Sequence, residues 1–299
     1  MTHRPDAAMA VAAAREAAVC AARMRLPLRR QTWRGGAGEL AGAGSGSSLD
    51  FQDHRNYLPG DDPRHLNWAA YARTGNYSMK LFREEVSPTV EILFDGSPSM
   101  FLNEAKAHLS CGLLAFVVEA ARRDAATLAI HLLDGPRHHL ISGEEIDGGA
   151  WTRHIAASAE KPAFPPAPPR LDAIALRPGS LRVWITDLLF PAEPASLLRT
   201  LTRQRGSAIL LCPFADTEAA PDWSGVCDFQ DVESGHVEAR DVDASLRNRY
   251  LAAYRAHFAA WKEEAVRHHL PLARVPAGPP LAQALTAEAL ATRALEPAA

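Results

Sequence analysis

The sequence predicts an α/β protein built on a doubly wound, mostly parallel sheet. From residue 89 onward, short apolar β-prone segments alternate with longer segments of helical character. Two of the apolar segments, residues 89–94 and 181–186, are followed directly by an aspartate. Open α/β sheets bind their ligands beyond the carboxyl ends of the strands. If these two strands are neighbours, Asp95 and Asp187 lie side by side at that edge.

The first 88 residues are expected to form an N-terminal helix, loop and β extension. Residues 7–30 are Ala-rich with five arginines and few acids, which indicates an amphipathic helix with a basic end. An organelle transit peptide has a similar composition but is richer in serine. Residues 35–48 are rich in Gly and Ser and indicate a flexible loop, because their neighbours make a poor strand and a poor helix for a phosphate-binding loop.

The segment Pro-Gly-Asp-Asp-Pro-Arg at residues 59–64 indicates a turn, after which Asp62 caps a short helix that runs to Arg73. Trp68 and Tyr71 share a face of that helix, which favours core packing. Residues 77–85 are expected to form a strand beside the central one. The predicted segments are 1–34 (helix and basic segment), 35–88 (Gly-rich loop and extension) and 89–299 (α/β domain).

The α/β domain is expected to alternate strands and helices, with a buried aromatic stripe on its long penultimate helix, an irregular proline-rich loop over 161–170 and a β-hairpin over 229–239. Expected strands are 89–94, 127–133, 181–186, 207–212 and 272–275, with a hairpin return over 136–141; expected helices are 105–121, 148–160, 195–205 and 244–269, followed by a final helix.

The string Asp95-Gly96-Ser97-Pro98-Ser99-Met100 carries the predicted chemistry. Its carboxylate and two hydroxyls alternate between a strand and a helix, so that three oxygen donors surround one point. Oxygen donors suit Mg²⁺ or Mn²⁺ better than zinc. In isolation the same string is typical of helix N-caps. The preceding strand and the second aspartate, Asp187, favour a metal site.

Composition argues against several classes of function. A formal net charge of −3 gives no support to nucleic-acid binding, and no segment is long and apolar enough to span a bilayer. The four cysteines show no Cys-x-x-Cys pairing and no zinc spacing, which indicates buried free thiols in a reducing cytosol. We therefore expect a cytoplasmic protein.

Several motifs resemble one family. They are Gly44-Ser45-Gly46, Asp53 to Tyr57, Pro59 to Arg64, Asn67-Trp68, Ala72-Arg73, Asp95 to Met100, Thr186-Asp187-Leu188 and Asp231 to Gly235, with Tyr250 on the long helix. Together they resemble the "domain of unknown function 58" family, which is similar to von Willebrand factor A domains. The resemblance covers roughly residues 40–285. It implies a von Willebrand factor A-type (Rossmann-like) sheet and a partner, since members are commonly encoded near MoxR-type AAA+ ATPases.

The resemblance also implies a metal site of Asp95, Ser97, Ser99 and Asp187, with a threonine from a further loop. That threonine is missing here, because Pro168-Pro169-Arg170 stands in its place and could bring a guanidinium close to the metal. Asn67 is a second departure, since the family usually has Asp before Trp.

The expected function is a non-catalytic, metal-dependent protein-binding module that assists a MoxR-type ATPase in chaperone-like complex maturation. In it, Ser97 and Ser99 ligate the ion and a partner carboxylate takes an open position. The upstream block supplies a candidate second contact through Asp61, Asp62, Arg64 and Arg73.

The enzymatic alternative is a haloacid-dehalogenase-like phosphotransferase with Asp95 as nucleophile. Those enzymes carry a second Asp two residues later, where this chain has Ser97. The Gly-x-Ser-x-Gly elbow of serine hydrolases is also missing, because Met100 follows Ser99.

Overall fold

The structure is a computed structural model that describes residues 3, 5–28, 40–45, 51–58, 66–147, 151–158 and 167–298. The chain divides into two compact units, Met1–Pro27 together with Thr89–Ala299, and Leu28–Pro88. The N-terminal helix thus belongs to the same unit as the large sheet, whereas the sequence interpretation gave residues 1–34 a segment of their own.

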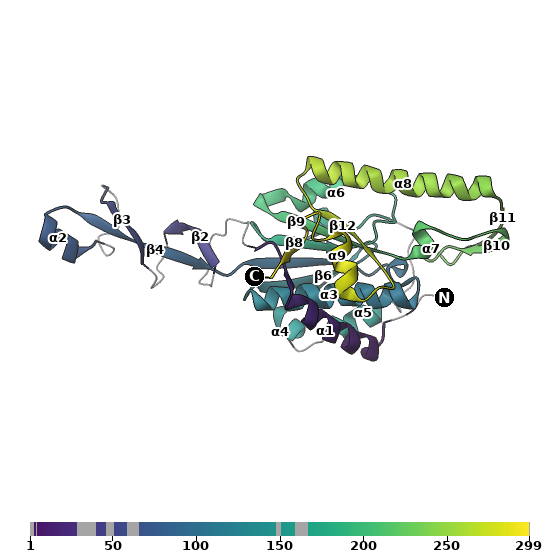
Figure 1. The fold of residues 1–299 in the computed structure, drawn as a ribbon, viewed down its shortest axis with the longest axis horizontal. Helices are drawn as coiled ribbons and strands as arrows, with labels where there is room; N and C mark the ends of the chain where they lie inside the picture. Colours follow the sequence, from purple (N-terminus) through teal and green to yellow (C-terminus); the bar gives the residue numbers. More distant parts are fainter. Residues whose placement is uncertain are drawn as a thin grey trace. The chain divides into compact units, whose positions relative to one another are not determined.

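A six-stranded sheet in the order β12-β9-β8-β5-β6-β7 forms the centre of the larger unit (Figure 1). All neighbouring strands run parallel except β6 and β7, which confirms the doubly wound fold class and the predicted hairpin return. The central strand is β5, with β8 as one neighbour, as predicted. The strands are β5 (Thr89–Asp95), β6 (Thr127–Asp134), β7 (Arg137–Ile141), β8 (Leu181–Ile185), β9 (Ser207–Phe214) and β12 (Leu272–Pro276).

Helix α3 (Glu104–Arg123) leads directly away from the end of β5. Asn103 caps it by accepting a hydrogen bond from the backbone N–H of Lys106 (2.8 Å). The helix is buried on most of its surface, as expected for one packed between a sheet and other helices. Helix α1 (Ala7–Ala21) packs against it through small residues, among them Ala10, Ala13 and Ala17. This packing accounts for the Ala-rich N-terminus.

The other helices surround the sheet, with α6 and α8 on the face opposite α1 and α3 (Figure 1). The predicted aromatic stripe is confirmed, because Tyr254, Phe258 and Trp261 of α8 are buried against the sheet residue Trp184. The elements are α4 (Gly143–Asp147), α5 (Trp151–Ser158), α6 (Pro194–Leu201), α7 (Asp216–Ala219), α8 (Ala244–Arg267) and α9 (Leu281–Glu288), with short strands β1 (Met24–Arg25) and β13 (Glu296–Pro297).

One predicted helix differs from the structure, and another is described only in part. The helix expected over 195–205 ends at Leu201, because Gln204 has a φ of +55°, outside the helical range. Of the helix expected over 148–160, the structure describes α5, while residues 148–150 and 159–166 lie outside the described part. The hairpin expected over 229–239 is confirmed and is longer, with β10 (Gly225–Gln230) antiparallel to β11 (Val237–Val242).

The smaller unit has its own antiparallel sheet in the order β2-β4-β3, built from β2 (Leu40–Ser45), β4 (Ser78–Val86) and β3 (Phe51–Asn56). Two predictions are therefore wrong. Residues 40–45 form a strand and not a loop, because strand pairing uses the backbone, which Gly and Ala supply like any residue. Residues 78–86 lie in this separate sheet and not beside the central strand β5, since β2 and β3 occupy both edges of β4.

The short helix α2 (Trp68–Thr74) begins at Asn67, whose side chain accepts the N–H of Ala70 (3.1 Å). Asn67, the departure from the family pattern, is thus a helix cap. The prediction that Trp68 and Tyr71 pack in a core is wrong. Trp68 is 59% exposed, and Tyr71 stacks on Tyr77 with ring centroids 4.4 Å apart. The predicted turn at residues 59–64 lies outside the described residues.

Candidate functional site

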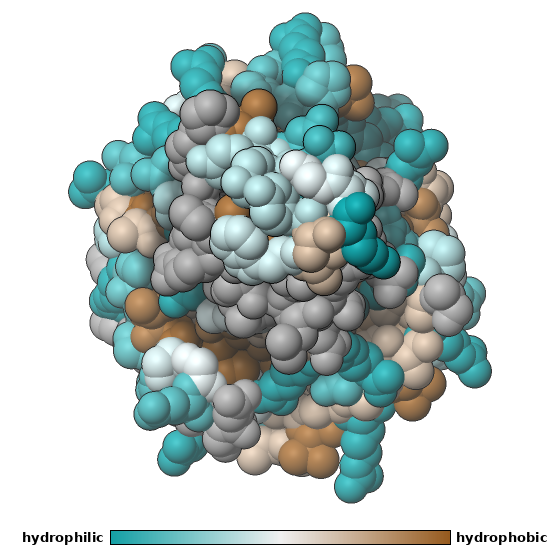
Figure 2. Space-filling model, turned by 90° about the vertical axis from the view of Figure 1, so that its left-hand side faces the viewer, coloured by the Kyte–Doolittle hydropathy of each residue, from teal (hydrophilic) through white to brown (hydrophobic). Residues whose placement is uncertain are grey.

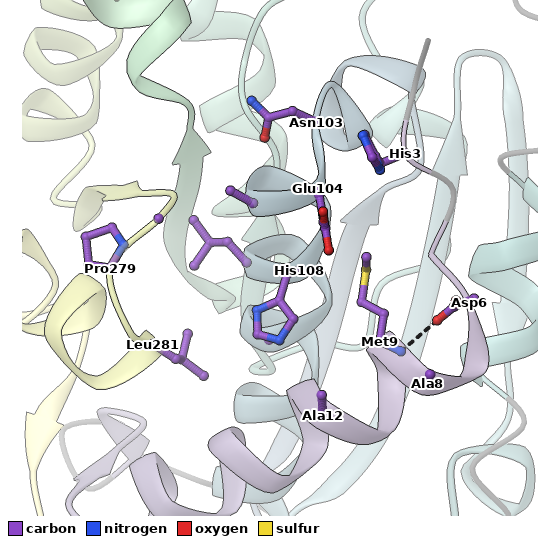
Figure 3. A pocket seen from close by; sticks show the side chains of 14 residues that line it. His3, Asp6, Ala8, Met9, Ala12, Asn103, Glu104, His108, Pro279 and Leu281 are labelled. Carbon is purple, nitrogen blue, oxygen red and sulfur yellow. Dashed lines mark hydrogen bonds between the residues drawn. The ribbon is translucent and has the colours of Figure 1, made fainter.

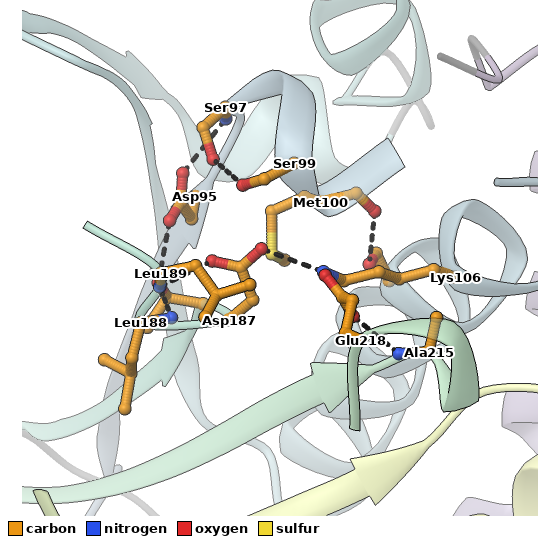
Figure 4. Close-up of polar contacts among 12 residues, drawn as sticks. Asp95, Ser97, Ser99, Met100, Lys106, Asp187, Leu188, Leu189, Ala215 and Glu218 are labelled. Carbon is orange, nitrogen blue, oxygen red and sulfur yellow. Dashed lines mark hydrogen bonds and ion pairs between the residues drawn. The ribbon is translucent and has the colours of Figure 1, made fainter. Parts of the chain in front are cut away.

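The predicted oxygen donors gather at the carboxyl end of β5 (Figure 4). Asp95 is the last residue of the strand, and a single 3₁₀ turn (Pro98–Phe101) links it to α3. Pro98 fits the first position of that turn because its φ is already near the helical value. The chain therefore presents Asp95, Ser97 and Ser99 around one point, as the sequence predicts.

Asp95 is held by two hydrogen bonds. One carboxylate oxygen accepts the backbone N–H of Ser97 (2.9 Å) and the other accepts the hydroxyl of Thr186 (2.7 Å). Burial, and then the charge of Asp187, raise the pKa of Asp95 to about 6, although these hydrogen bonds act in the opposite direction. Its orienting residue, Thr186, directly follows the adjacent parallel strand β8, and the sequence interpretation gave Thr186 no such role.

The hydroxyls of Ser97 and Ser99 are hydrogen-bonded to each other, with their oxygens 3.1 Å apart. Neighbouring ligands of an octahedral Mg²⁺ with bonds of about 2.1 Å are about 3 Å apart, so this spacing fits two adjacent coordination positions. Both serines line a cavity of about 30 Å³, together with Asp95 and Glu233. A space of this size holds one water molecule or one small ion.

Asp187 lies next to this group but is engaged elsewhere. One of its carboxylate oxygens accepts the N–H of Leu189 (3.0 Å), and the other receives the ammonium of Lys106 (2.9 Å). It is 2% exposed and is not among the residues that line the small cavity. The structure therefore places Asp187 where its charge acts on the site while its oxygens are held by the protein.

Lys106 is a component that the sequence interpretation missed. Its side chain is fully buried, and its ammonium also contacts the carboxylate of Glu218 (2.6 Å). Burial alone would lower the pKa of Lys106, but the charges of Asp187 and Glu218 outweigh burial and keep the pKa above its ordinary value. The available signal was a lone lysine in the first turn of a largely apolar helix.

Glu233 is the second missed component. Its carboxylate accepts the backbone N–H of Ser99 (3.1 Å) across 134 positions of sequence. Burial raises the pKa of Glu233 to about 7, to which the charges of Asp95 and Asp187 contribute, while the hydrogen bond from Ser99 lowers it. The motif resemblance covered this segment without giving Glu233 a role.

The donor chemistry fits Mg²⁺ or Mn²⁺. Both ions prefer oxygen ligands, and Mg²⁺ usually keeps several waters beside one or two carboxylates. Within the described ranges, no group of three or more His, Cys, Asp or Glu side chains is arranged to hold a metal, so hydroxyls and waters would supply most ligands. Pro169 lines the cavity where the family threonine is expected, whereas Arg170 is exposed and does not line it.

The candidate partner-binding residues lie in the smaller unit. Arg73 is exposed, and its guanidinium donates to the carbonyl of Ala69 in its own helix (3.3 Å). Asp61, Asp62 and Arg64 lie outside the described residues. Their proposed role as a second contact remains a prediction.

A larger cavity of about 820 Å³ lies elsewhere, between α1, the start of α3 and the Pro279 region (Figure 3). Asp6 and Asn103 on its wall are occupied as helix caps, and His108 lies 3.7 Å from Glu16. Their placement is explained by helix capping and packing. Volume alone does not make this cavity the functional site.

The comparisons with known proteins agree with the motifs. Residues 53–260 match the family described as "Protein of unknown function DUF58". The chain belongs to the DUF58 family. It is 26% identical over 243 residues to the uncharacterized proteins Rv1480 of Mycobacterium tuberculosis and Mb1516 of Mycobacterium bovis, covering 74% of this chain and 72% of each relative.

Two solved structures are also similar to this DUF58 chain. The conserved hypothetical protein BatB from Bacteroides thetaiotaomicron is 14% identical, with a TM-score of 0.39, over 69% of this chain and 99% of its own. An aerotolerance-related membrane protein from Bacteroides fragilis is 15% identical, with a TM-score of 0.35, over 61% of this chain and 99% of its own. Among the helices described here, none has the length and apolar character needed to cross a membrane.

Proposed function

We propose that this DUF58 protein is a non-catalytic binding module that holds Mg²⁺ or Mn²⁺ at Ser97 and Ser99 and recognises an acidic side chain of a partner protein through that ion. The supporting observation is the pair of hydroxyls at adjacent-ligand spacing, 3.1 Å apart, at the switch point of the sheet. The ion would supply a positive charge that attracts the incoming carboxylate.

The charges around the site support a cation. Five carboxyl groups lie at this end of the sheet, those of Asp95, Asp134, Asp187, Glu218 and Glu233. Lys106 contacts two of them and Arg137 pairs with Asp134. Burial is the main cause of the raised pKa values of Asp95 and Glu233, and repulsion from neighbouring carboxylates adds to it. A divalent ion at the hydroxyls would relieve that repulsion.

Figure 2 shows the end of the molecule away from α7, β10 and β11, and its coloured residues are a mixture of hydrophilic and hydrophobic side chains. The carboxyl end of β5, where the proposed ion binds, does not face the viewer in this figure.

The partner we propose, by family resemblance, is a MoxR-type AAA+ ATPase in the cytoplasm. Pull-down of the tagged full chain from host lysate in Mg²⁺, followed by mass spectrometry, is expected to recover that ATPase. Chelation is expected to reduce recovery by about tenfold or more, because the ion bridges the two proteins. Ser97→Ala with Ser99→Ala is expected to do the same, since the bridging ion loses its ligands.

A matched control is Ser196→Ala with Ser245→Ala, which removes two exposed hydroxyls, on α6 and α8, from residues that do not line the small cavity. It should leave recovery unchanged. Equal recovery with the Ser97/Ser99 variant would show that this face is not the docking surface.

We also predict that the purified protein turns over neither phosphate esters nor acyl esters, with or without Mg²⁺. Asp95, the nucleophile of the phosphotransferase alternative, is 6% exposed, and both its oxygens accept hydrogen bonds. Release of p-nitrophenol from p-nitrophenyl phosphate and acetate is the measurement. Turnover that disappears in folded Asp95→Asn would revive the phosphotransferase.

A further inference from the structure

The turn of the β10–β11 hairpin is built to hold Glu233 in one place. The carboxylate of Asp231 accepts the N–H of Glu233 (2.9 Å) and the hydroxyl of Ser234 (2.6 Å). Gly235 closes the turn with a φ of +73°, a conformation that glycine adopts readily, and donates its N–H to the carbonyl of Asp231 (2.8 Å). The backbone around Glu233 is thus fixed by local hydrogen bonds.

From this turn, the side chain of Glu233 extends to the loop that carries the hydroxyls of Ser97 and Ser99. One of its carboxylate oxygens accepts the N–H of Ser99 (3.1 Å), and its side chain lines the same small cavity as Ser97, Ser99 and Asp95. A hydrogen bond to one oxygen leaves the second oxygen available as a ligand. The loop that should carry the family threonine contributes Pro169 to this cavity, and a proline side chain has no donor atom for a metal.

We infer that Glu233 is an internal ligand of this site, which takes the coordination position that a partner's carboxylate would occupy. This inference rests on the proposed metal-dependent binding function. A partner carboxylate then binds only after the β10–β11 hairpin has moved Glu233 out of the cavity. The acidic partner and Glu233 compete because they offer the same functional group to the same ion.

The hairpin is suited to such a movement. Within the described part of the chain, β10 and β11 pair with each other and with no strand of the six-stranded sheet. Most of their side chains are exposed, and the rings of Trp223, Phe229 and Tyr250 pack where the hairpin meets α8. A displacement of the hairpin therefore breaks few contacts of the core.

The test uses the full chain and Mn²⁺ as the probe. Titration calorimetry gives its affinity, and water proton relaxation reports the waters bound to it. In Glu233→Ala we expect affinity to fall by about tenfold, since a carboxylate ligand is lost. Relaxation enhancement per bound Mn²⁺ is expected to rise, because water fills the vacated position. Acetate should reduce the enhancement in this variant and leave the wild type unchanged.

Glu233→Gln retains an oxygen that can accept the N–H of Ser99. This variant therefore separates the loss of a carboxylate ligand from a local loss of structure. It is expected to behave as an intermediate between the wild type and Glu233→Ala. The matched control is Glu238→Gln on β11, where an exposed glutamate pairs with Arg240 (2.6 Å) outside the cavity. It should match the wild type in affinity, relaxation and acetate response.

Two outcomes contradict the inference, and they separate it from the proposed function. If the wild type and Glu233→Ala bind Mn²⁺ with equal affinity and give equal relaxation enhancement, Glu233 is not a ligand, although the metal site itself exists. Absence of Mn²⁺ binding in every variant would overturn both.

Discussion

Replacing Lys106 by methionine is expected to lower the free energy of unfolding by about 3–5 kcal/mol, because it leaves the buried carboxylates of Asp187 and Glu218 without their cation. Methionine has a similar length and an apolar end, so the loss reports the charge and not a cavity. The ammonium contacts both carboxylates, at 2.9 and 2.6 Å, with no exposure of its own. Urea unfolding followed by circular dichroism measures the change.

The control for this substitution is Lys262→Met on α8. Lys262 pairs with Glu288 at 3.3 Å, but its side chain is 46% exposed. Exposed ion pairs contribute about 0–1 kcal/mol, so the control should cost little. Adding Asp187→Asn and Glu218→Gln to Lys106→Met should recover part of the lost stability, since the orphaned charges are removed. Equal effects of Lys106→Met and Lys262→Met would mean that the buried triad contributes nothing.

The free energy of unfolding of the metal-free protein is expected to fall as the pH rises from about 4 to about 7. In the folded protein, the pKa of Asp95 is raised from its ordinary 3.8 to about 6, and that of Glu233 from 4.5 to about 7. At a pH between the ordinary and the raised pKa of each group, the folded state binds more protons than the unfolded chain. Raising the pH therefore favours unfolding. For buried Asp95, the difference between the ordinary and the raised pKa is equivalent to about 3 kcal/mol.

Urea unfolding between pH 4.5 and 8 in the presence of a chelator measures this slope. Asp95→Asn should remove much of it, because an amide does not titrate. Saturating Mg²⁺ should also flatten it, since an ion favours the ionised carboxylates. Glu91 contributes in the opposite direction at the acid end of this range, because nearby His131, the Ser180 hydroxyl and the Arg177 backbone N–H hold its pKa below the ordinary value despite burial. A free energy of unfolding that rises between pH 4.5 and 8 would show that Asp95 and Glu233 do not have raised pKa values in the folded protein.

The sheet and the loop from Asp95 to Ser99 were predictable because short stretches of sequence indicate them. The apolar run that ends in Asp95 and the one that precedes Asp187 have the length of buried strands, and the parallel-sheet rule places their ends together. The structure pairs Phe94 with Ile185, which brings the two aspartates to one edge. The smaller unit was predicted less well, because β2 is rich in Gly and Ala and gives no apolar alternation.

Lys106 and Glu233 could not be placed in the same way. Lys106 depends on Glu218, 112 positions later, and Glu233 depends on Ser99, 134 positions earlier. Neither contact follows from periodicity or from the order of the strands. Each of these two contacts depends on the position of a loop or a hairpin that follows the core strands.

Calorimetric titration of Mg²⁺ into the chelator-treated full chain decides whether Ser97 and Ser99 hold an ion. We predict saturable binding to the wild type and its loss in Ser97→Ala with Ser99→Ala, a variant whose melting temperature in chelator stays close to that of the wild type. Mg²⁺ should raise the melting temperature of the wild type alone, since it binds the folded state. Binding that is undetectable in the wild type, or unchanged without the two hydroxyls, would show that Ser97 and Ser99 do not form a metal site.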